Sequence, residues 1–504
     1  MIEFILNNQT ISTDLSPGTT VLDFVRYHEN LKGTKIGCRE GDCGACTILV
    51  GEPVGDEVSY RSMTSCLMPL ANAAGKHIVS IEGINRDDGG LTPVQQAMLD
   101  ESGTQCGFCT VGFVMSLTGF CLDNTEKTPD LAISSIDGNI CRCTGYKSIE
   151  RAAERICDRL RNGKIEAVPA YFTEIPNRLE KLNAASIQAE TRPIGSVPFV
   201  GGGTDVYVQK PEHMTETEAR PLFYDDQLRG VRDMGDYIEI GASATVTDLL
   251  VSPVMQGVFP ALYKHLKLIS STPIRNMATL AGNFANASPI GDMTIWFLAL
   301  NAEIILSSQG ATAASDLVRT GSDSDRVLSL RDFYLGYKQL DKSAAEYITA
   351  IRFAKPKGDF RFNFEKVSKR TYLDIATVNT AISVTTSSPP YKGGVDAAAP
   401  LLSEEGRRRF ADGVVRSTES NDNVITEAHL SAGGVAPIPL YLKQTSAFLK
   451  RKPISAQTIA EANEIMQSEI SPISDIRGTA AYKRLLLRQL FTAHFVELFG
   501  QDAV

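Results

Sequence analysis

The chain has 504 residues, a length that predicts about three domains or slightly more. Its hydrophobic fraction of 43% and charged fraction of 22% are ordinary for a globular protein. A net charge of −9, without any extended basic stretch, argues against a nucleic-acid-binding function.

The N-terminal residues 1–8 contain no basic segment followed by a long apolar core, so we expect no signal peptide. No run of 18 or more apolar residues occurs, so we expect no membrane span and a cytoplasmic location. The chain has ten cysteines. In a reducing compartment their spacing indicates metal or redox chemistry rather than disulfides.

The first part of the chain predicts a small β-rich domain that carries four of these cysteines. Residues 2–12 predict a β-hairpin, residues 21–31 have helical spacing, and residues 47–50 and 77–81 predict strands. The cysteines follow the C-x4-C-x2-C…C pattern of plant-type ferredoxins, which bind a [2Fe–2S] cluster. They are Cys38, Cys43, Cys46 and Cys66. Zinc also takes four cysteines, but three so crowded on one glycine-rich loop favour the iron cluster.

A second set of four cysteines lies in a region that predicts a helical bundle. It forms a C-x2-C pair and a C-x-C pair, which are Cys106, Cys109, Cys141 and Cys143. Four thiolates again suit either a [2Fe–2S] cluster or zinc, and C-x-C fits a zinc knuckle poorly. The predicted helices span 94–99, 110–122, 129–136 and 146–160. Cys121 and Cys157 lie on apolar helix faces, and we expect both in the core.

The sequence around the second set resembles a known family. Gln-Cys-Gly-Phe-Cys-Thr at 105–110 and Gly-Asn-Ile-Cys-Arg-Cys-Thr-Gly-Tyr at 138–146 resemble the iron–sulfur portion of the molybdenum hydroxylases. The resemblance implies that the bundle cluster lies nearest the molybdopterin of the family and that Gln105 contacts the pterin. The chain departs from the family at Val111, where proline is usual.

Two glycine- and asparagine-rich stretches follow a proline-interrupted connector. Alone, the Gly-Gly-Gly-Thr-Asp run at 201–205 is more typical of an ordinary tight turn than of a phosphate loop, and it is no Rossmann motif. Together with 274–292, however, it resembles the vanillyl-alcohol-oxidase-type FAD domain of the same family, in the same order. The resemblance implies FAD contacts at Phe199, Val200, Gly201, Gly202, Gly203, Thr204, Asp205, Val206, Ile269, Thr279, Gly282, Asn283, Asp292, Ile348 and Lys366.

Within this set the resemblance assigns 201–206 to the FAD diphosphate. It assigns 279–283 and Asp292 to the adenosine side, and Ile269 and Ile348 to packing on the flavin. Lys366 matches a family lysine near the cofactor, although on the residues alone it could be a solvated surface charge. Tyr337 matches a position beside the nicotinamide in xanthine dehydrogenases, and as an aromatic near a strand it could equally be core.

The remaining segments carry fewer signals. Residues 307–325 and 390–424 have loop composition, and no function is inferred for either. Residues 425–432 predict a strand, and 444–449, 459–466 and 482–498 predict helices. At Leu373-Asp374 the chain lacks the acidic pair common in the family. No Ser-His-Asp or Cys-His constellation is evident, so we expect no catalytic side chain.

These observations predict a multidomain α+β protein. The expected units are a β-grasp ferredoxin domain, a helical-bundle cluster domain, a linker, an α+β FAD domain and an α/β C-terminal cap. Their predicted boundaries are 1–85, 86–165, 166–192, 193–385 and 386–504.

The resemblance covers nearly the whole chain and is closest to the iron–sulfur/FAD small subunits of bacterial xanthine dehydrogenases. It implies two [2Fe–2S] clusters, FAD, NAD+ as acceptor, a separate molybdopterin chain as partner and a dimer of heterodimers. Electrons from xanthine or hypoxanthine oxidation on the partner would leave as hydride on NAD+. Two alternatives remain open: a subunit serving an aldehyde or N-heterocycle hydroxylase, and a stand-alone redox carrier.

Overall fold

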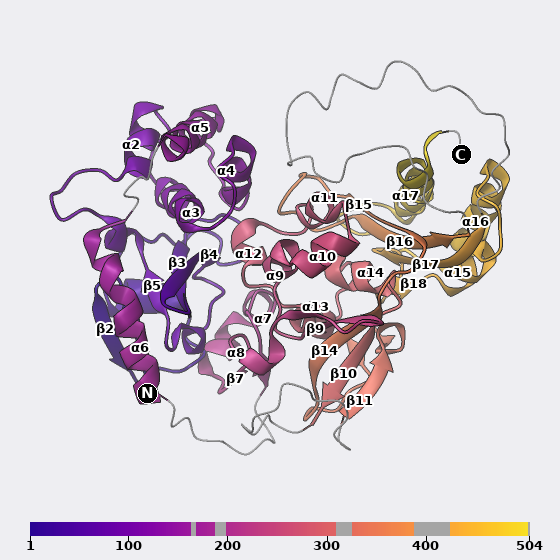
Figure 1. Ribbon diagram of the computed structural model, residues 1–504, viewed down its shortest axis with the longest axis horizontal. Helices are drawn as coiled ribbons and strands as arrows, with labels where there is room; N and C mark the ends of the chain where they lie inside the picture. Colours follow the sequence, from indigo (N-terminus) through magenta and orange to yellow (C-terminus); the bar gives the residue numbers. More distant parts are fainter. Residues whose placement is uncertain (163–167, 187–197, 309–324, 388–423, 502–504) are drawn as a thin grey trace.

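The computed structural model describes residues 1–162, 168–186, 198–308, 325–387 and 424–501. The chain forms four units in sequence order (Figure 1). The N-terminal sheet and the helical bundle above it lie at one end, the FAD domain lies in the middle, and the C-terminal sheet lies at the far end. The two segments predicted as loops, 307–325 and 390–424, fall almost entirely outside the described residues.

The N-terminal domain is a five-stranded mixed sheet in the order β2-β1-β5-β3-β4, with β1 and β5 parallel. Alternating apolar residues of β1 and β3 face the chain segment of the first cysteine set. In place of the helix expected over 21–31, a single turn at Val21–Asp23 continues into a wide π-helical turn at Phe24–His28. The strands are β1 (Ile2–Leu6), β2 (Gln9–Thr13), β3 (Thr47–Val54), β4 (Glu57–Thr64) and β5 (His77–Val79).

Four helices form the predicted bundle. Thr92 caps the first of them in a capping box with Gln95, and the second begins directly at Thr110 despite the missing proline at position 111. Cys157 is fully buried in the core of the bundle and Cys121 packs against that core, so both expectations are confirmed. The helices are α2 (Pro93–Asp100), α3 (Thr110–Leu122), α4 (Pro129–Ser135) and α5 (Lys147–Arg161).

The predicted linker contains a helix that the proline pattern concealed. Helix α6 (Ile175–Ser186) places Pro176 in its first turn, where a helix does not need the missing N–H. Ile175 and Leu179, one turn apart, bury their side chains against Ile5 of the N-terminal sheet. The spacing of these two apolar residues was the signal that could have revealed it.

The FAD domain is built on a five-stranded antiparallel sheet in the order β11-β10-β14-β9-β8. Short helices cover one face, and their largest buried side chain is Trp296 on α14. The strands are β6 (Phe199–Val200), β7 (Arg220–Pro221), β8 (Val231–Asp233), β9 (Tyr237–Gly241), β10 (Glu303–Ser307), β11 (Asp325–Ser329), β12 (Tyr334–Gly336), β13 (Gln339–Leu340) and β14 (Tyr347–Ala354). The helices are α7 (Val206–Gln209), α8 (Pro211–Glu216), α9 (Val246–Val251), α10 (Pro253–Val258), α11 (Leu262–Leu266), α12 (Thr272–Arg275), α13 (Leu280–Asn286) and α14 (Asp292–Leu298).

The C-terminal sheet has the antiparallel order β15-β16-β17-β18 and is buried on both faces. Phe364 and Ala381 point into the core of the FAD domain, while Val378 and Ile382 point toward α17. Since β15 and β16 belong to this sheet, the predicted boundary at 385 falls inside it rather than before it. The elements are β15 (Asp359–Val367), β16 (Val378–Thr386), β17 (Ile425–Gly433), β18 (Leu440–Tyr441), α15 (Lys443–Leu449), α16 (Ala456–Glu469) and α17 (Ala480–Phe499). No described helix combines the length and apolar character needed to cross a membrane.

A buried ion pair joins the bundle to the FAD domain. Arg275, at the end of α12, donates to Asp137 at 2.7 Å, and both side chains are only 4% exposed. The same guanidinium donates to the carbonyl oxygens of Ile269 and Ser270, and Asp137 also accepts from the N–H of Thr272. The pair therefore fixes the orientation of two domains through fully hydrogen-bonded charges.

Replacing Arg275 by methionine should lower the midpoint of thermal unfolding by several degrees. The change leaves Asp137 buried without its partner, and breaking a buried pair typically costs about 3 to 5 kcal/mol. Differential scanning fluorimetry of the purified chain measures the effect. Lys357→Gln is the matched control, because its ion pair with Asp236 is highly exposed. Equal, small shifts in both variants would contradict the prediction.

Candidate iron–sulfur and flavin sites

The loop of the first cysteine set has a backbone conformation that brings glycines and N–H donors close to the cysteine sulfurs. Gly41 and Gly44 have positive φ values of 77° and 67°, which disfavour other residues. A Cβ at Gly37 would lie 2.5 Å from the sulfur of Cys43. The backbone N–H groups of Glu40 and Asp42 both donate to Cys38 Sγ at 3.3 Å. The loop thus provides hydrogen-bond donors to sulfur, as an anionic cluster requires.

These thiols contact one another in pairs. Cys43 hydrogen-bonds to Cys38, and Cys46 to Cys66. Each contact shifts the pKa values of its two thiols in opposite directions: it lowers the pKa of Cys38 to about 5 and raises that of Cys43, and it lowers the pKa of Cys46 and raises that of Cys66. A low pKa favours the thiolate, which is the form that binds a metal.

The second cysteine set shows the same pairing at the base of the bundle. Cys143 Sγ lies 3.6 Å from Cys106 Sγ, and Cys109 hydrogen-bonds to Cys141. Cys141 Sγ also accepts from the backbone N–H groups of Cys143 and Thr144 at 3.4 and 3.5 Å. Loops far apart in the sequence therefore bring all four predicted ligands together.

The paired arrangement suits a two-iron cluster better than zinc. Two thiolates on one tetrahedral metal lie about 3.8 Å apart when the metal–sulfur bond is 2.3 Å, which is close to the separation of Cys106 and Cys143. Two thiols per metal, repeated twice, is the ligand set of a [2Fe–2S] centre.

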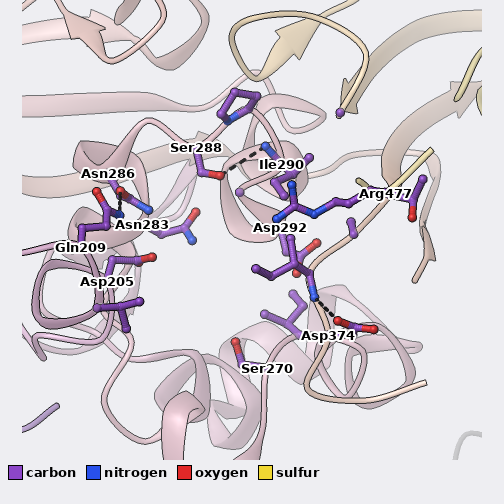
Figure 2. A pocket seen from close by; sticks show the side chains of 18 of the residues that line it. Asp205, Gln209, Ser270, Asn283, Asn286, Ser288, Ile290, Asp292, Asp374 and Arg477 are labelled. Atoms are coloured by element: carbon purple, nitrogen blue, oxygen red, sulfur yellow. Dashed lines mark hydrogen bonds between the residues drawn. The ribbon is translucent and has the colours of Figure 1, made fainter. Parts of the chain in front are cut away.

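A cavity of about 1150 Å³ lies where the FAD domain meets the N-terminal loop and the C-terminal sheet. Figure 2 shows Asp205, Gln209 and Asn286 gathered on one side, with Arg477 and Asp374 on the other. Gln209 donates to Asn286 at 2.9 Å, which ties α7 to α13 along this wall. The cavity is large enough for an extended dinucleotide.

The glycine loop, residues 201–205, reaches the edge of this cavity at Thr204 and Asp205 and has backbone N–H groups without acceptors in the described part of the chain. None of the N–H groups of residues 202–205 has an acceptor among the described residues. A Cβ at Gly202 would overlap the carbonyl oxygen of Met277, so only glycine permits this close approach. A row of free backbone N–H groups is the arrangement that binds a diphosphate. Burial raises the pKa of the neighbouring Asp205.

Six predicted positions line the cavity, whereas the others lie behind its wall. The lining positions are Thr204, Asp205, Ile269, Asn283, Asp292 and Tyr337. Phe199, Val200, Gly201, Gly202, Gly203, Val206, Thr279, Gly282, Ile348 and Lys366 do not line it. Ile348 is buried in the core of the FAD domain, and Thr279 caps α13 by accepting from the N–H of Gly282.

Lys366 is buried and forms an ion pair with Asp292, so it is not a solvated surface charge. Its side chain is 2% exposed, and its Nζ donates to Asp292 at 2.6 Å and to the carbonyl oxygen of Leu268 at 3.0 Å. Asn379 donates to the other oxygen of Asp292. The carboxylate predicted to accept from a ribose is thus held by two protein donors at the floor of the cavity.

Sequence reasoning missed the parts of the cavity that come from other domains. Glu40, Gly41 and Asp42 of the first cysteine loop line it, and so do Arg477 and Lys483 near the C-terminal helix. Asp42 also pairs with Arg370 at 3.5 Å, across the domain boundary. No local sequence pattern predicts these contacts, because they form only when the domains pack against one another.

Four protein-family models match the chain in the order of its domains. They are a 2Fe-2S iron-sulfur cluster binding domain at 4–71, a [2Fe-2S] binding domain at 80–154, an FAD binding domain in molybdopterin dehydrogenase at 175–356 and a CO dehydrogenase flavoprotein C-terminal domain at 413–498. The chain therefore carries two [2Fe–2S] binding domains followed by an FAD binding domain of the kind found in molybdopterin dehydrogenases. Its cofactors are two [2Fe–2S] clusters and FAD.

Relatives with curated names are similar over nearly the whole chain. The xanthine dehydrogenase of Emericella nidulans is 26% identical over 99% of the chain, and that of Blastobotrys adeninivorans is 27% identical over 96%. The chain spans only 39% of the length of either relative.

Solved structures are similar at lower identity. Carbon monoxide dehydrogenase from Hydrogenophaga pseudoflava is 22% identical, with a TM-score of 0.47 over 60% of this chain and 88% of that one. Quinoline 2-oxidoreductase from Pseudomonas putida 86 is 19% identical, with a TM-score of 0.46 over 61% of this chain and 90% of that one.

Iron and flavin analysis of the purified protein should give about four irons and one FAD per chain, because each four-cysteine site holds two irons. Inductively coupled plasma spectrometry and the absorbance of released flavin measure both quantities. Zinc in place of iron would refute the cluster assignment.

Replacing Cys43 by alanine should remove the first cluster and leave the second, so that iron falls to about two per chain. The two sites use separate loops and separate cores. Electron paramagnetic resonance of the reduced protein distinguishes the two signals. The Cys121→Ala variant, which alters a cysteine outside both sites, should keep both. Equal loss of both signals in Cys43→Ala would show that the domains do not assemble independently.

Proposed function

We propose that this chain is the electron-transfer subunit of a xanthine dehydrogenase. It would receive electrons from a molybdopterin-bearing partner chain that oxidises xanthine or hypoxanthine, and deliver them to NAD+. When bound, the clusters carry single electrons and FAD converts them to the two-electron hydride that NAD+ accepts. The proposal rests on the domain order and on the names of the relatives, which join these domains to further sequence.

One observation supports electron flow between the first cluster site and the flavin. Gly41 and Asp42, which lie between cluster ligands Cys38 and Cys43, form part of the wall of the FAD cavity. Arg370, beyond this wall, pairs with Asp42 at 3.5 Å. This contact between the first cysteine loop and the cavity supports electron transfer between the proposed cluster and the flavin.

The second cluster site supports the need for a partner. Cys106 and Cys143 are exposed, and so is the adjacent Gln105, the position we propose as the pterin contact. Phe108 and Tyr146 are 47% and 38% exposed beside them. An open face at a redox site, rimmed by aromatic residues, suits contact with another redox chain.

Acceptor binding is proposed at the opposite side of the cavity. Tyr337 lines the cavity and is 63% exposed, so it is available to a nicotinamide ring rather than buried in a core. Lys338 beside it donates to Asn286 and anchors the turn that carries the tyrosine. We propose that hydroxylation requires a molybdopterin-bearing partner chain and that the assembly is a dimer of heterodimers.

Tagged protein purified from its own cells, with its partner attached, should form NADH from NAD+ and xanthine. Absorbance at the NADH band measures this, and the isolated chain with the same substrates is the control and should form none. A molybdenum-bearing partner that is inactive with xanthine but oxidises an aldehyde or another N-heterocycle would move the substrate and keep the electron route. The absence of any partner would favour a stand-alone carrier and contradict the proposal.

A further inference from the structure

The glycine loop of the FAD domain leans against the N-terminal domain. A Cβ at Gly203 would overlap the carbonyl oxygen of Leu67 and would lie 3.3 Å from Pro69. Leu67 directly follows the cluster ligand Cys66. The proposed phosphate cradle is therefore backed by a turn of a different domain.

Asn72 of the N-terminal domain adds a hydrogen bond to this contact with the glycine loop. Its side-chain amide donates to the carbonyl oxygen of Gly201 at 3.1 Å, and the residue is only 2% exposed. Its other side-chain atom, Oδ1, has no partner among the described residues, so the donor bond to Gly201 is the one bond found for this side chain. An asparagine held in this way costs desolvation, and the bond it makes must offset that cost.

Fixing a carbonyl fixes the peptide plane that follows it. The carbonyl of Gly201 shares its plane with the N–H of Gly202, the first of the free N–H groups of the cradle. Because this carbonyl is drawn toward Asn72, the N–H must point away from the N-terminal domain. Gly202 cannot shift sideways, since Met277 closes the space beside it.

We propose that Asn72 is a positioning residue for FAD: a side chain of the ferredoxin domain orients the phosphate-binding loop of the neighbouring domain. The inference rests on the proposed contact between residues 201–206 and the FAD diphosphate. It follows that FAD affinity depends on the turn that begins at Cys66. Flavin binding and the folding of the first cluster domain are then thermodynamically coupled.

The test measures FAD affinity rather than turnover. Flavin-depleted full-length protein that retains both cluster signals is titrated with FAD, and quenching of flavin fluorescence reports binding. Loss of one neutral hydrogen bond, worth about 0.5 to 1.5 kcal/mol, predicts a Kd about 3- to 10-fold higher for Asn72→Ala. The increase in the unfolding midpoint that FAD produces should shrink in the same variant, while the flavin-free midpoint should change little.

Two further variants make the result specific. Arg61→Gln removes the ion pair of Arg61 with Asp248, which joins the same two domains elsewhere, and should leave the Kd unchanged. Gly202→Ala displaces the cradle itself and should abolish tight binding. If Asn72→Ala does not fold, the isosteric variant Asn72→Asp is used instead. It replaces the donor by an acceptor, and its Kd for FAD is expected to rise by the same factor.

Each possible result of the FAD titrations either supports or overturns a stated part of the proposal. A Kd raised at least about threefold in the Asn72 variant, with Arg61→Gln unchanged, supports the inference. A smaller change, or an equal loss in Arg61→Gln, overturns it, because general loosening of the interface would then explain the data. Unchanged binding in both Asn72→Ala and Gly202→Ala would overturn the diphosphate assignment itself. Normal binding in Asn72→Ala with loss in Gly202→Ala would overturn only the role of Asn72.

Discussion

The structure depends on one apolar core that two domains share. Val200, Tyr207 and Met277 of the FAD domain pack in the same buried cluster as the cluster ligands Cys46 and Cys66. Close-packed interiors transmit displacement rather than absorb it. The first cluster site therefore cannot move relative to the flavin cavity without opening a core. Electron transfer needs a fixed distance between sites, and this shared core provides it without an additional device.

Apolar packing alone would permit several orientations of the two domains, and buried polar groups select one. The amide of Asn276 donates to the backbone carbonyl of Ser62 at 2.8 Å, and Arg275 pairs with Asp137. A buried polar group that loses its partner costs far more than the bond contributes. In any other relative orientation of the two domains, these polar groups would be buried without hydrogen-bond partners. We infer that the polar contacts give the junction its specificity, while the shared core gives it most of its stability.

Local chemistry was predictable from the sequence, whereas contacts between domains were not. Cysteine spacing and glycine content predicted two four-cysteine sites, because the arrangement of ligands is encoded within short loops, and the structure places the cysteines of each set in contacting pairs. The helix at 110–122 was predicted to the residue from its apolar content and helical spacing. Helix α6 was missed because Pro176, which lies in its first turn, was interpreted as an interruption of the helical pattern. The placement of β15 and β16 was missed because strand pairing is a long-range choice that no pattern within the strand records.

The two cluster sites differ in the solvent exposure of their cysteines. In the first, Cys46 and Cys66 are 3% and 4% exposed, and domains of this chain complete the surroundings. In the second, Cys106 and Cys143 are open to solvent. Solvent exposure strengthens the screening of a charged cluster and changes its potential. We propose that the partner chain covers this second site and so sets its potential, whereas the first site already obtains its surroundings from the domains of this chain.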